Sequence, residues 1–143
     1  MCQEDVRDRI GYLVKQVAQA FRSASEERLR GIGLSMAQYA VLTALRDAPG
    51  APAAELARRT FVTRQSLRDV LSGLTGRGLA SVAPEPPAGG RAQPVNLTDA
   101  GRSLLAEAEA IVLETEARMT AGLSGDEAEQ LAGLLRRCRA GLD

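Results

Sequence analysis

The chain has 143 residues and carries 18 basic and 18 acidic side chains, so its formal charge at neutral pH is zero. This length favours one domain, and apolar residues make up 45% of the chain, enough for a core. Histidine is absent, which excludes His-based catalytic triads and the common zinc-ligand sets and argues against an enzyme. We expect no cofactor and no metal site.

The N-terminus is charged, and no run of eighteen apolar residues occurs, so we expect neither a secretory signal nor a membrane span. A cytoplasmic location follows as an expectation. The two cysteines, Cys2 and Cys138, lie at opposite ends of the chain and form no framework of the kind found in small secreted domains. We expect reduced thiols, with Cys138 in the core, and a redox role for either thiol stays open.

Apolar residues at helical spacing predict a long amphipathic helix from Glu4 to Leu29. Gly31 and Gly33 follow this pattern and end the helix. Ser35 begins a second helix and forms a capping box with the glutamine three residues later, so two orphan backbone donors gain partners. This helix is predicted to end near Pro49-Gly50.

Two short helical patterns follow, Pro52 to Arg59 and Val62 to Leu79, joined by a three-residue connection. Pro52 suits the first turn of its helix, because its missing N–H would be unpaired there in any case. Thr63 stands where its hydroxyl can cap the next helix, and Gly76 and Gly78 stand where that helix ends. The longer pattern has one apolar stripe, made of Leu67, Val70, Leu71 and Leu74.

The opposite face of the helix 62–79 carries hydrogen-bonding side chains: Arg64, Gln65, Arg68, Asp69 and Ser72. Most amphipathic helices carry such a face simply because it meets water. Here, however, two short helices and a tight connection make a helix-turn-helix, in which the second helix can read base edges. Arginines gather in this region, whereas acidic residues gather later in the chain, at Glu107, Glu109, Glu114 and Glu116. A solvated helix face is the favoured reading of these acids over a catalytic pair.

The segment Ala80 to Leu97 contains two short extended runs, SVA and PVNL, around the turn-rich sequence PEPPAGGR. This pattern predicts a β-hairpin. Pro94 within the return strand implies an edge position, because proline cannot donate to a strand ladder. A hairpin directly after a helix-turn-helix makes a winged helix-turn-helix.

Two further helices are predicted, the first capped by Thr98 and the second opened by a capping box of Ser124 and Glu127. Together with the first helix, they carry more apolar surface than one short chain can cover, which favours a symmetric dimer. The predicted fold is mainly α with a small β-hairpin wing. Its parts are an N-terminal dimerisation helix (1–33), a winged helix-turn-helix region (34–100) and C-terminal dimerisation helices (101–143), all in one compact domain.

Four segments succeed one another in a specific order: LSMAQYAVLTAL, AELARRTFVTRQSL, GLTGRGLA and GRAQPVNLTDAGRSLL. In this order the stretch from Leu34 to Leu105 resembles the MarR family of bacterial transcriptional regulators. Two departures stand out. Phe61 replaces a glycine that many relatives have in the turn, and we expect it to pack down as a core anchor. Gly89 replaces an aspartate near the wing arginine, Arg91, so we expect a looser wing.

The resemblance implies a homodimer that binds double-stranded DNA at a near-palindromic operator, as a repressor of transcription. It places five residues of the recognition helix at the major groove: Thr63, Arg64, Gln65, Ser66 and Arg68. Thr63 and Ser66 are alternatively expected to hold phosphate. Arg91 would enter the adjacent minor groove, with a solvated loop charge as the alternative.

The resemblance further implies a pocket for a small apolar or phenolic effector where the dimerisation helices meet the winged helix-turn-helix region. The candidate lining residues are Tyr12, Phe21, Met36 and Tyr39, with ordinary core packing as the alternative for each. The first helix lacks the cysteine with which some relatives sense peroxides. An alternative function is a helical dimerisation or protein-docking module of the same fold that does not bind DNA, which the neutral net charge permits.

Overall fold

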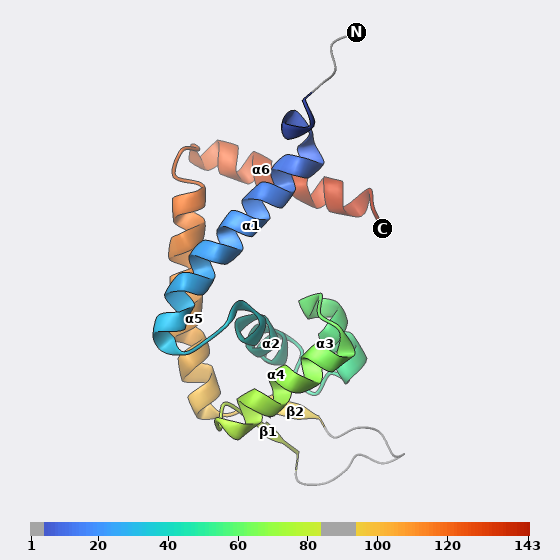
Figure 1. Ribbon diagram of the computed structural model, residues 1–143, viewed down its shortest axis with the longest axis vertical. Helices are drawn as coiled ribbons and strands as arrows, with labels where there is room; N and C mark the ends of the chain where they lie inside the picture. The colour runs from blue at the N-terminus through green and yellow to red at the C-terminus, as the bar shows by residue number, and fades with distance from the viewer. Residues whose placement is uncertain (1–4, 84–93) are drawn as a thin grey trace.

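The structure is a computed structural model that describes residues 5–83 and 94–143. Its order of helices and strands confirms the predicted mainly helical fold with one β-hairpin (Figure 1). The elements, in chain order, are η1 (Val6–Asp8), α1 (Ile10–Leu29), η2 (Arg30–Ile32), α2 (Met36–Asp47), α3 (Ala53–Thr60), α4 (Arg64–Gly76), β1 (Ala80–Val82), β2 (Val95–Leu97), α5 (Asp99–Met119) and α6 (Gly125–Ala140).

The molecule has two parts that α5 joins. Figure 1 shows α1, α6 and both chain ends on one side, and α2, α3, α4 and the hairpin gathered at the other. The long helix α5 runs from the base of the hairpin to the end where α6 begins and packs against α1 on the way. The part made of α2, α3, α4 and the hairpin is therefore held at one end of a helical stalk, which consists of α1, α5 and α6.

Side-chain caps begin the helices where the sequence predicts them. Ser35 Oγ accepts a hydrogen bond from the Gln38 N–H at 3.0 Å, and Gln38 Oε1 accepts one from the Ser35 N–H at 2.9 Å. Ser124 and Glu127 form the second predicted capping box at the start of α6. Both boxes satisfy backbone donors that a helix start leaves unpaired, so they fix where α2 and α6 begin.

Three predicted boundaries need correction. The first α-helix begins at Ile10 instead of Glu4, because a short 3-10 turn, η1, precedes it and Arg9 between them has extended backbone. Pro52 is the residue before α3 and not in its first turn. The helix predicted from Val62 to Leu79 is α4, which spans Arg64–Gly76, and Gly78, with φ of 73°, makes the left-handed turn that follows it.

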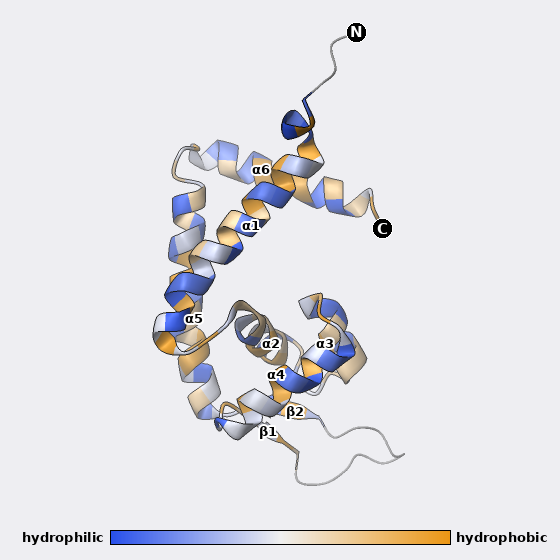
Figure 2. Ribbon diagram, in the orientation of Figure 1, coloured by the Kyte–Doolittle hydropathy of each residue, from blue (hydrophilic) through white to orange (hydrophobic). Residues whose placement is uncertain are grey.

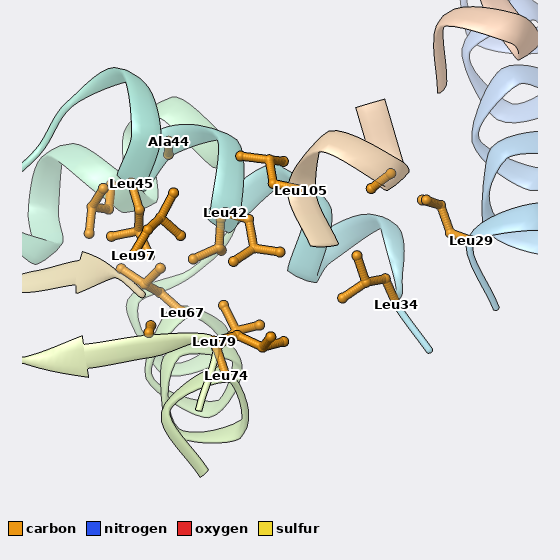
Figure 3. Packing of buried hydrophobic residues seen from close by; sticks show 14 of the residues in the cluster. Leu29, Leu34, Leu42, Ala44, Leu45, Leu67, Leu74, Leu79, Leu97 and Leu105 are labelled. Atoms are coloured by element: carbon orange, nitrogen blue, oxygen red, sulfur yellow. The ribbon is translucent and has the colours of Figure 1, made fainter. Parts of the chain in front are cut away.

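The core is rich in leucine and lies between α2, α4, the hairpin and the start of α5 (Figure 3). Leu67 and Leu74 of the predicted α4 stripe are fully buried, whereas Val70 and Leu71 pack at its edge. Leu42 from α2 and Leu105 from α5 complete the centre. This cluster fixes the orientation of α4, because its apolar stripe faces inward and its polar face must then face outward.

The hairpin strands β1 and β2 pair antiparallel, with Ala80 opposite Leu97 and Val82 opposite Val95. Pro94 immediately precedes β2, and its carbonyl accepts a hydrogen bond from the Ala83 N–H at 3.0 Å. The proline thus contributes only an acceptor to the hairpin, which agrees with its lack of an N–H. The hairpin tip lies outside the described residues.

Large apolar side chains stay exposed on the helices of the stalk. No residue of α6 is buried, and Leu134 is 53% exposed. Ile10 on α1 is 73% exposed. Figure 2 shows hydrophobic residues interspersed with hydrophilic ones along α1 and α6. Cys138 is exposed as well, so its expected place in the core is wrong, because α6 packs too little against its own chain to bury it.

Among residues 5–83 and 94–143, no helix is both long and apolar enough to cross a membrane.

Candidate nucleic-acid interface

The connection between α3 and α4 holds the recognition helix at a fixed angle. The Val62 N–H donates to the Ala57 carbonyl at 3.3 Å, and the Thr60 hydroxyl donates to the Leu56 carbonyl at 2.7 Å. Leu56 and Ala57 are buried, and Val62 packs against the core. The turn is therefore anchored on both sides, as a helix-turn-helix requires for its second helix to be presented rigidly.

Phe61 does not pack down as the core anchor that its sequence position suggested. The residue is 85% exposed, and its backbone is left-handed, with φ of 57°. The residue that ends α3 must adopt this conformation for the chain to turn. The apolar anchor of the connection is Val62 instead.

Thr63 caps α4 as predicted: its Oγ1 accepts a hydrogen bond from the Ser66 N–H at 3.0 Å. The hydroxyl hydrogen of Thr63 is not used in this bond. An anion at the start of α4 would therefore meet a hydroxyl donor beside the backbone N–H groups of the first helical turn.

Arg64, Gln65, Ser66 and Arg68 are all exposed on the face of α4 that points away from the core. In the part of the chain that the structure describes, neither Arg64 nor Arg68 has a carboxylate within ion-pair distance. On α3, by contrast, Glu55 lies 3.9 Å from Arg58 and 3.2 Å from Arg59. The two arginines of α4 are thus the cations of the helix-turn-helix that have no competing acid.

One acidic residue, Asp69, lies on α4 one helical turn after Gln65. Its Oδ1 accepts a hydrogen bond from Gln65 Nε2 at 3.4 Å. This contact occupies one N–H of the Gln65 amide and leaves its oxygen free to accept a hydrogen bond. Together, the face offers guanidinium donors, an amide and hydroxyls, which are the groups that bind phosphates and base edges.

The base of the hairpin is tied directly to the ends of α4 and α5. The Thr98 hydroxyl donates to the Gly78 carbonyl at 2.6 Å and accepts from the Gly101 N–H at 3.0 Å. The Thr98 N–H donates to the Leu79 carbonyl at 3.2 Å. The start of the wing is therefore fixed relative to the recognition helix. Arg91, the predicted minor-groove residue, lies outside the described residues, as does Gly89.

A contact that the sequence did not predict joins the end of α4 to the junction between α1 and α2. Arg77, the residue that follows α4, donates from Nη1 to the carbonyl of Gly33 at 2.6 Å. Gly33 lies at the junction between α1 and α2 and has φ of 78°. Nothing in the sequence signals this pairing, because the two residues are 44 positions apart.

A cavity of about 310 Å³ lies between α1 and α5. Its lining is apolar apart from one hydroxyl and one guanidinium, and consists of Val17, Ala20, Phe21, Ala24, Thr115, Arg118 and Met119. Of the four predicted effector residues, only Phe21 lies there. Tyr12 is exposed further toward the start of α1, whereas Met36 and Tyr39 pack on α2 against the core.

The cavity shares only Phe21 with the predicted set, because that set consists of aromatic and methionine side chains of α1 and α2. The structure brings α5 beside α1 instead. Arg118 and Met119 follow Thr115 by three and four residues, so the three share one face of α5, but that spacing alone does not distinguish a cavity from a dimer surface.

Tyr39 responds to its half-buried position on α2. Burial raises the pKa of its phenol above the usual value of 10.0, because the charged phenolate is poorly solvated there, while a hydrogen bond with Thr43 acts in the opposite direction. Tyr39 therefore remains a neutral phenol over the physiological range.

Two of the four glutamates noted in the sequence of α5 pair with arginines of neighbouring helices at the surface. Glu109 lies 2.8 Å from Arg46 of α2, and Glu114 pairs with Arg28 of α1. Across the described part of the chain, no three Cys, Asp or Glu side chains gather in a way that would hold a metal ion. These acids thus link α5 to its neighbouring helices.

Comparisons with known proteins point to one family. The MarR family model matches residues 32–92. The HTH-type transcriptional repressor Rv2887 of Mycobacterium tuberculosis is 34% identical over 128 residues, which span 90% of this chain and 91% of that protein. Crystal structures of Rv2887 are similar throughout. Its complex with salicylic acid has a TM-score of 0.77 at 32% identity and covers 94% of this chain and 98% of that one. Its complex with DNA has a TM-score of 0.77 at 31% identity, covering 91% and 97%.

Proposed function

The chain belongs to the MarR family of transcriptional regulators, and we propose that it is a repressor that binds a near-palindromic operator as a homodimer and leaves it when a small effector binds. The observation that carries the proposal is the outer face of α4. There, Arg64 and Arg68 are exposed and without an acidic partner among the described residues, on a helix that a leucine core holds rigidly.

In this proposal the face of α4 enters the major groove. Arg64, Gln65 and Arg68 contact base edges, since arginine pairs bidentately with guanine and glutamine with adenine. Thr63 and Ser66, at the start of the helix, hold phosphate. Arg91 at the wing enters the adjacent minor groove.

The exposed apolar faces of the stalk supply the dimer contact in the proposal. Residues 1–33 and 101–143 form the dimerisation part, and 34–100 form the DNA-binding region. A helix such as α6, which carries Leu131, Leu134 and Leu135 yet buries none of them within its own chain, needs a partner surface. A two-fold symmetric pair covers these leucines and presents two recognition helices about one turn of DNA apart, hence the near-palindromic operator.

The cavity between α1 and α5 is the effector site in the proposal. Rv2887 has been crystallised with salicylic acid, a small aromatic acid. Phe21 and Met119 suit an aromatic ring, and Arg118 suits a carboxylate. The cavity lies between two stalk helices, so a ligand there would alter how two copies pack and hence the spacing of their recognition helices.

Binding to the DNA upstream of the protein's own gene is the direct test. Mobility shifts with the purified protein should give a complex that resists unrelated competitor DNA and weakens steeply as salt rises, because phosphate contacts release counterions. Salicylate should dissolve the complex of the native protein at lower concentration than that of Arg118→Gln. If neither the upstream region nor unrelated DNA is bound at low salt, the repressor proposal fails.

That negative result would favour the alternative, a protein-docking module of the same fold. The affinity of docking on an apolar patch changes little with salt, whereas the affinity for DNA must fall as salt rises. The repressor proposal assigns the chain no catalytic role and places it in the cytoplasm, where a bacterial operator is accessible.

A further inference from the structure

Phe61 is the most conspicuous side chain that the proposed contacts with DNA leave unused. It is the only residue other than glycine with positive φ in the described chain, and the residue is 85% exposed. A left-handed backbone disfavours residues with a Cβ, and an aromatic ring gains nothing from contact with water. Glycine at this position would remove both penalties, so the free chain derives no benefit from a phenylalanine here.

The ring stands directly beside the start of the recognition helix. Phe61 ends α3, and two residues later Thr63 caps α4. The turn is held by the Val62 N–H on the Ala57 carbonyl and by the buried residues of α3, so the backbone of Phe61 is fixed next to the start of α4. A duplex that contacts Arg64 would therefore pass beside the turn that carries Phe61.

We propose that Phe61 contacts the operator itself, packing its ring on the apolar surface of the DNA that thymine methyl groups and deoxyribose edges form beside the groove. This inference rests on the proposed function and adds a contact of a different kind to it. The arginines supply charge, whereas Phe61 supplies apolar burial. Its contribution to affinity is accordingly independent of salt.

The surroundings of Phe61 favour DNA over a protein partner. The exposed residues nearest in sequence include Arg58, Arg59 and Arg64, of which Arg58 and Arg59 share Glu55 as a partner, so the segment around Phe61 carries a net positive charge and is not an apolar patch. The apolar surface that suits a second copy lies on α1 and α6, at the other end of the molecule (Figure 1). A single aromatic ring bordered by arginines suits a polyanion that also offers apolar edges.

Three variants separate the ring from the turn it occupies. Phe61→Gly and Phe61→Asn both tolerate the left-handed backbone, and asparagine keeps a side chain that restrains the turn. Phe61→Tyr keeps the aromatic ring. We expect the glycine and asparagine variants to melt at the same or a higher temperature than the native protein, yet to bind the operator about tenfold more weakly. The tyrosine variant should stay within about twofold of native affinity.

The salt series supplies the decisive readout. Loss of the ring should lower affinity by the same factor at every salt concentration, leaving the slope of log K against log salt unchanged, whereas Arg64→Ala should make the slope shallower. Native affinity in Phe61→Gly would overturn the inference, and so would native affinity in Phe61→Asn with loss in Phe61→Gly alone, which would indicate turn rigidity. In both cases native binding would still stand, so the proposed function would survive. Absence of native binding would overturn both.

Discussion

Gly101 is the position at which one added methyl group should do most damage to the DNA-binding part. It lies in the first turn of α5, buried against the chain that leads into β1. A Cβ built there would lie 2.0 Å from the Leu79 carbonyl oxygen and 3.0 Å from the carbonyl carbon. Both atoms belong to the backbone, so no side-chain rotation relieves the clash.

The size of the effect follows from these distances. Nonbonded atoms pack best at about 3.5 Å, so α5 and the start of the wing must separate by roughly 1.5 Å in Gly101→Ala. Overpacking of this kind costs about 1 to 3 kcal/mol. The separation also strains the bonds of Thr98 to Leu79 and Gly78, each worth about 1 kcal/mol. Alanine's better helix propensity returns about 1 kcal/mol, leaving a net loss of about 2 to 4 kcal/mol.

Thermal and urea unfolding of Gly101→Ala should show this loss at a fixed protomer concentration, because a dimer's stability depends on concentration. The melting temperature should fall by roughly 10 °C. Gly73→Ala is the matched control, since it lies within α4 and, apart from its own stretch of helix backbone and its chain neighbours, no described atom lies within 4 Å of its added Cβ. The control should gain about 0.5 to 1 kcal/mol. Equal or greater stability of Gly101→Ala would refute the close approach of α5 to the wing.

Three other substitutions test the site and its supports. Arg68→Ala should cost about 1 to 3 kcal/mol of operator binding and relax preference at one position in a panel of single-base operator variants, and a uniform loss across the panel would count against base reading. Thr98→Val should lower the free energy of unfolding by about 1 to 2 kcal/mol in urea titration, because the cap of α5 and the bond to Gly78 are both lost; an unchanged midpoint would contradict this. Burial raises the pKa of Tyr39, so its contribution to stability is full below the unfolded pKa of about 10 and is lost as pH rises through the higher folded pKa. Tyr39→Phe should flatten that decline in urea midpoints at alkaline pH, and an identical decline in both proteins would exclude Tyr39 as its source.

The helix caps and the apolar stripe of α4 could be predicted from the sequence because they depend on residues that are close together in the chain. Ser35, Thr63, Thr98 and Ser124 each stand before a helix and satisfy its first backbone donors, and the structure contains all four caps. Such caps depend on residues three positions apart, so sequence spacing carries nearly all the information. The same holds for the stripe of α4, whose outward polar face follows from its buried Leu67 and Leu74.

Features that depend on distant segments were beyond sequence reasoning. Phe61 and Val62 are adjacent apolar residues, and only the folded chain shows that Val62 packs against the core while Phe61, in a left-handed turn, is exposed to solvent. Cys138 has the spacing of a core residue on α6, but helical spacing does not say whether the apolar face meets its own chain or another. Arg118 joins a cavity because α1 and α5 lie side by side, which no local pattern encodes.

The contact between Arg77 and Gly33 bears on how an effector in the stalk could reach the recognition helix. Gly33 ends the turn that links α1 to α2, and Arg77 follows the last turn of α4. Their hydrogen bond therefore ties the end of α1 to the C-terminal end of the recognition helix α4. The other end of α4 is fixed to α3, and its buried face is fixed to α2. In the proposed mechanism, a rotation of α1 would act through this bond on the end of α4 that Thr98 also ties to the hairpin. Coupling of this kind needs only a small displacement, because a recognition helix that is tilted in one half-site loses its register with the other.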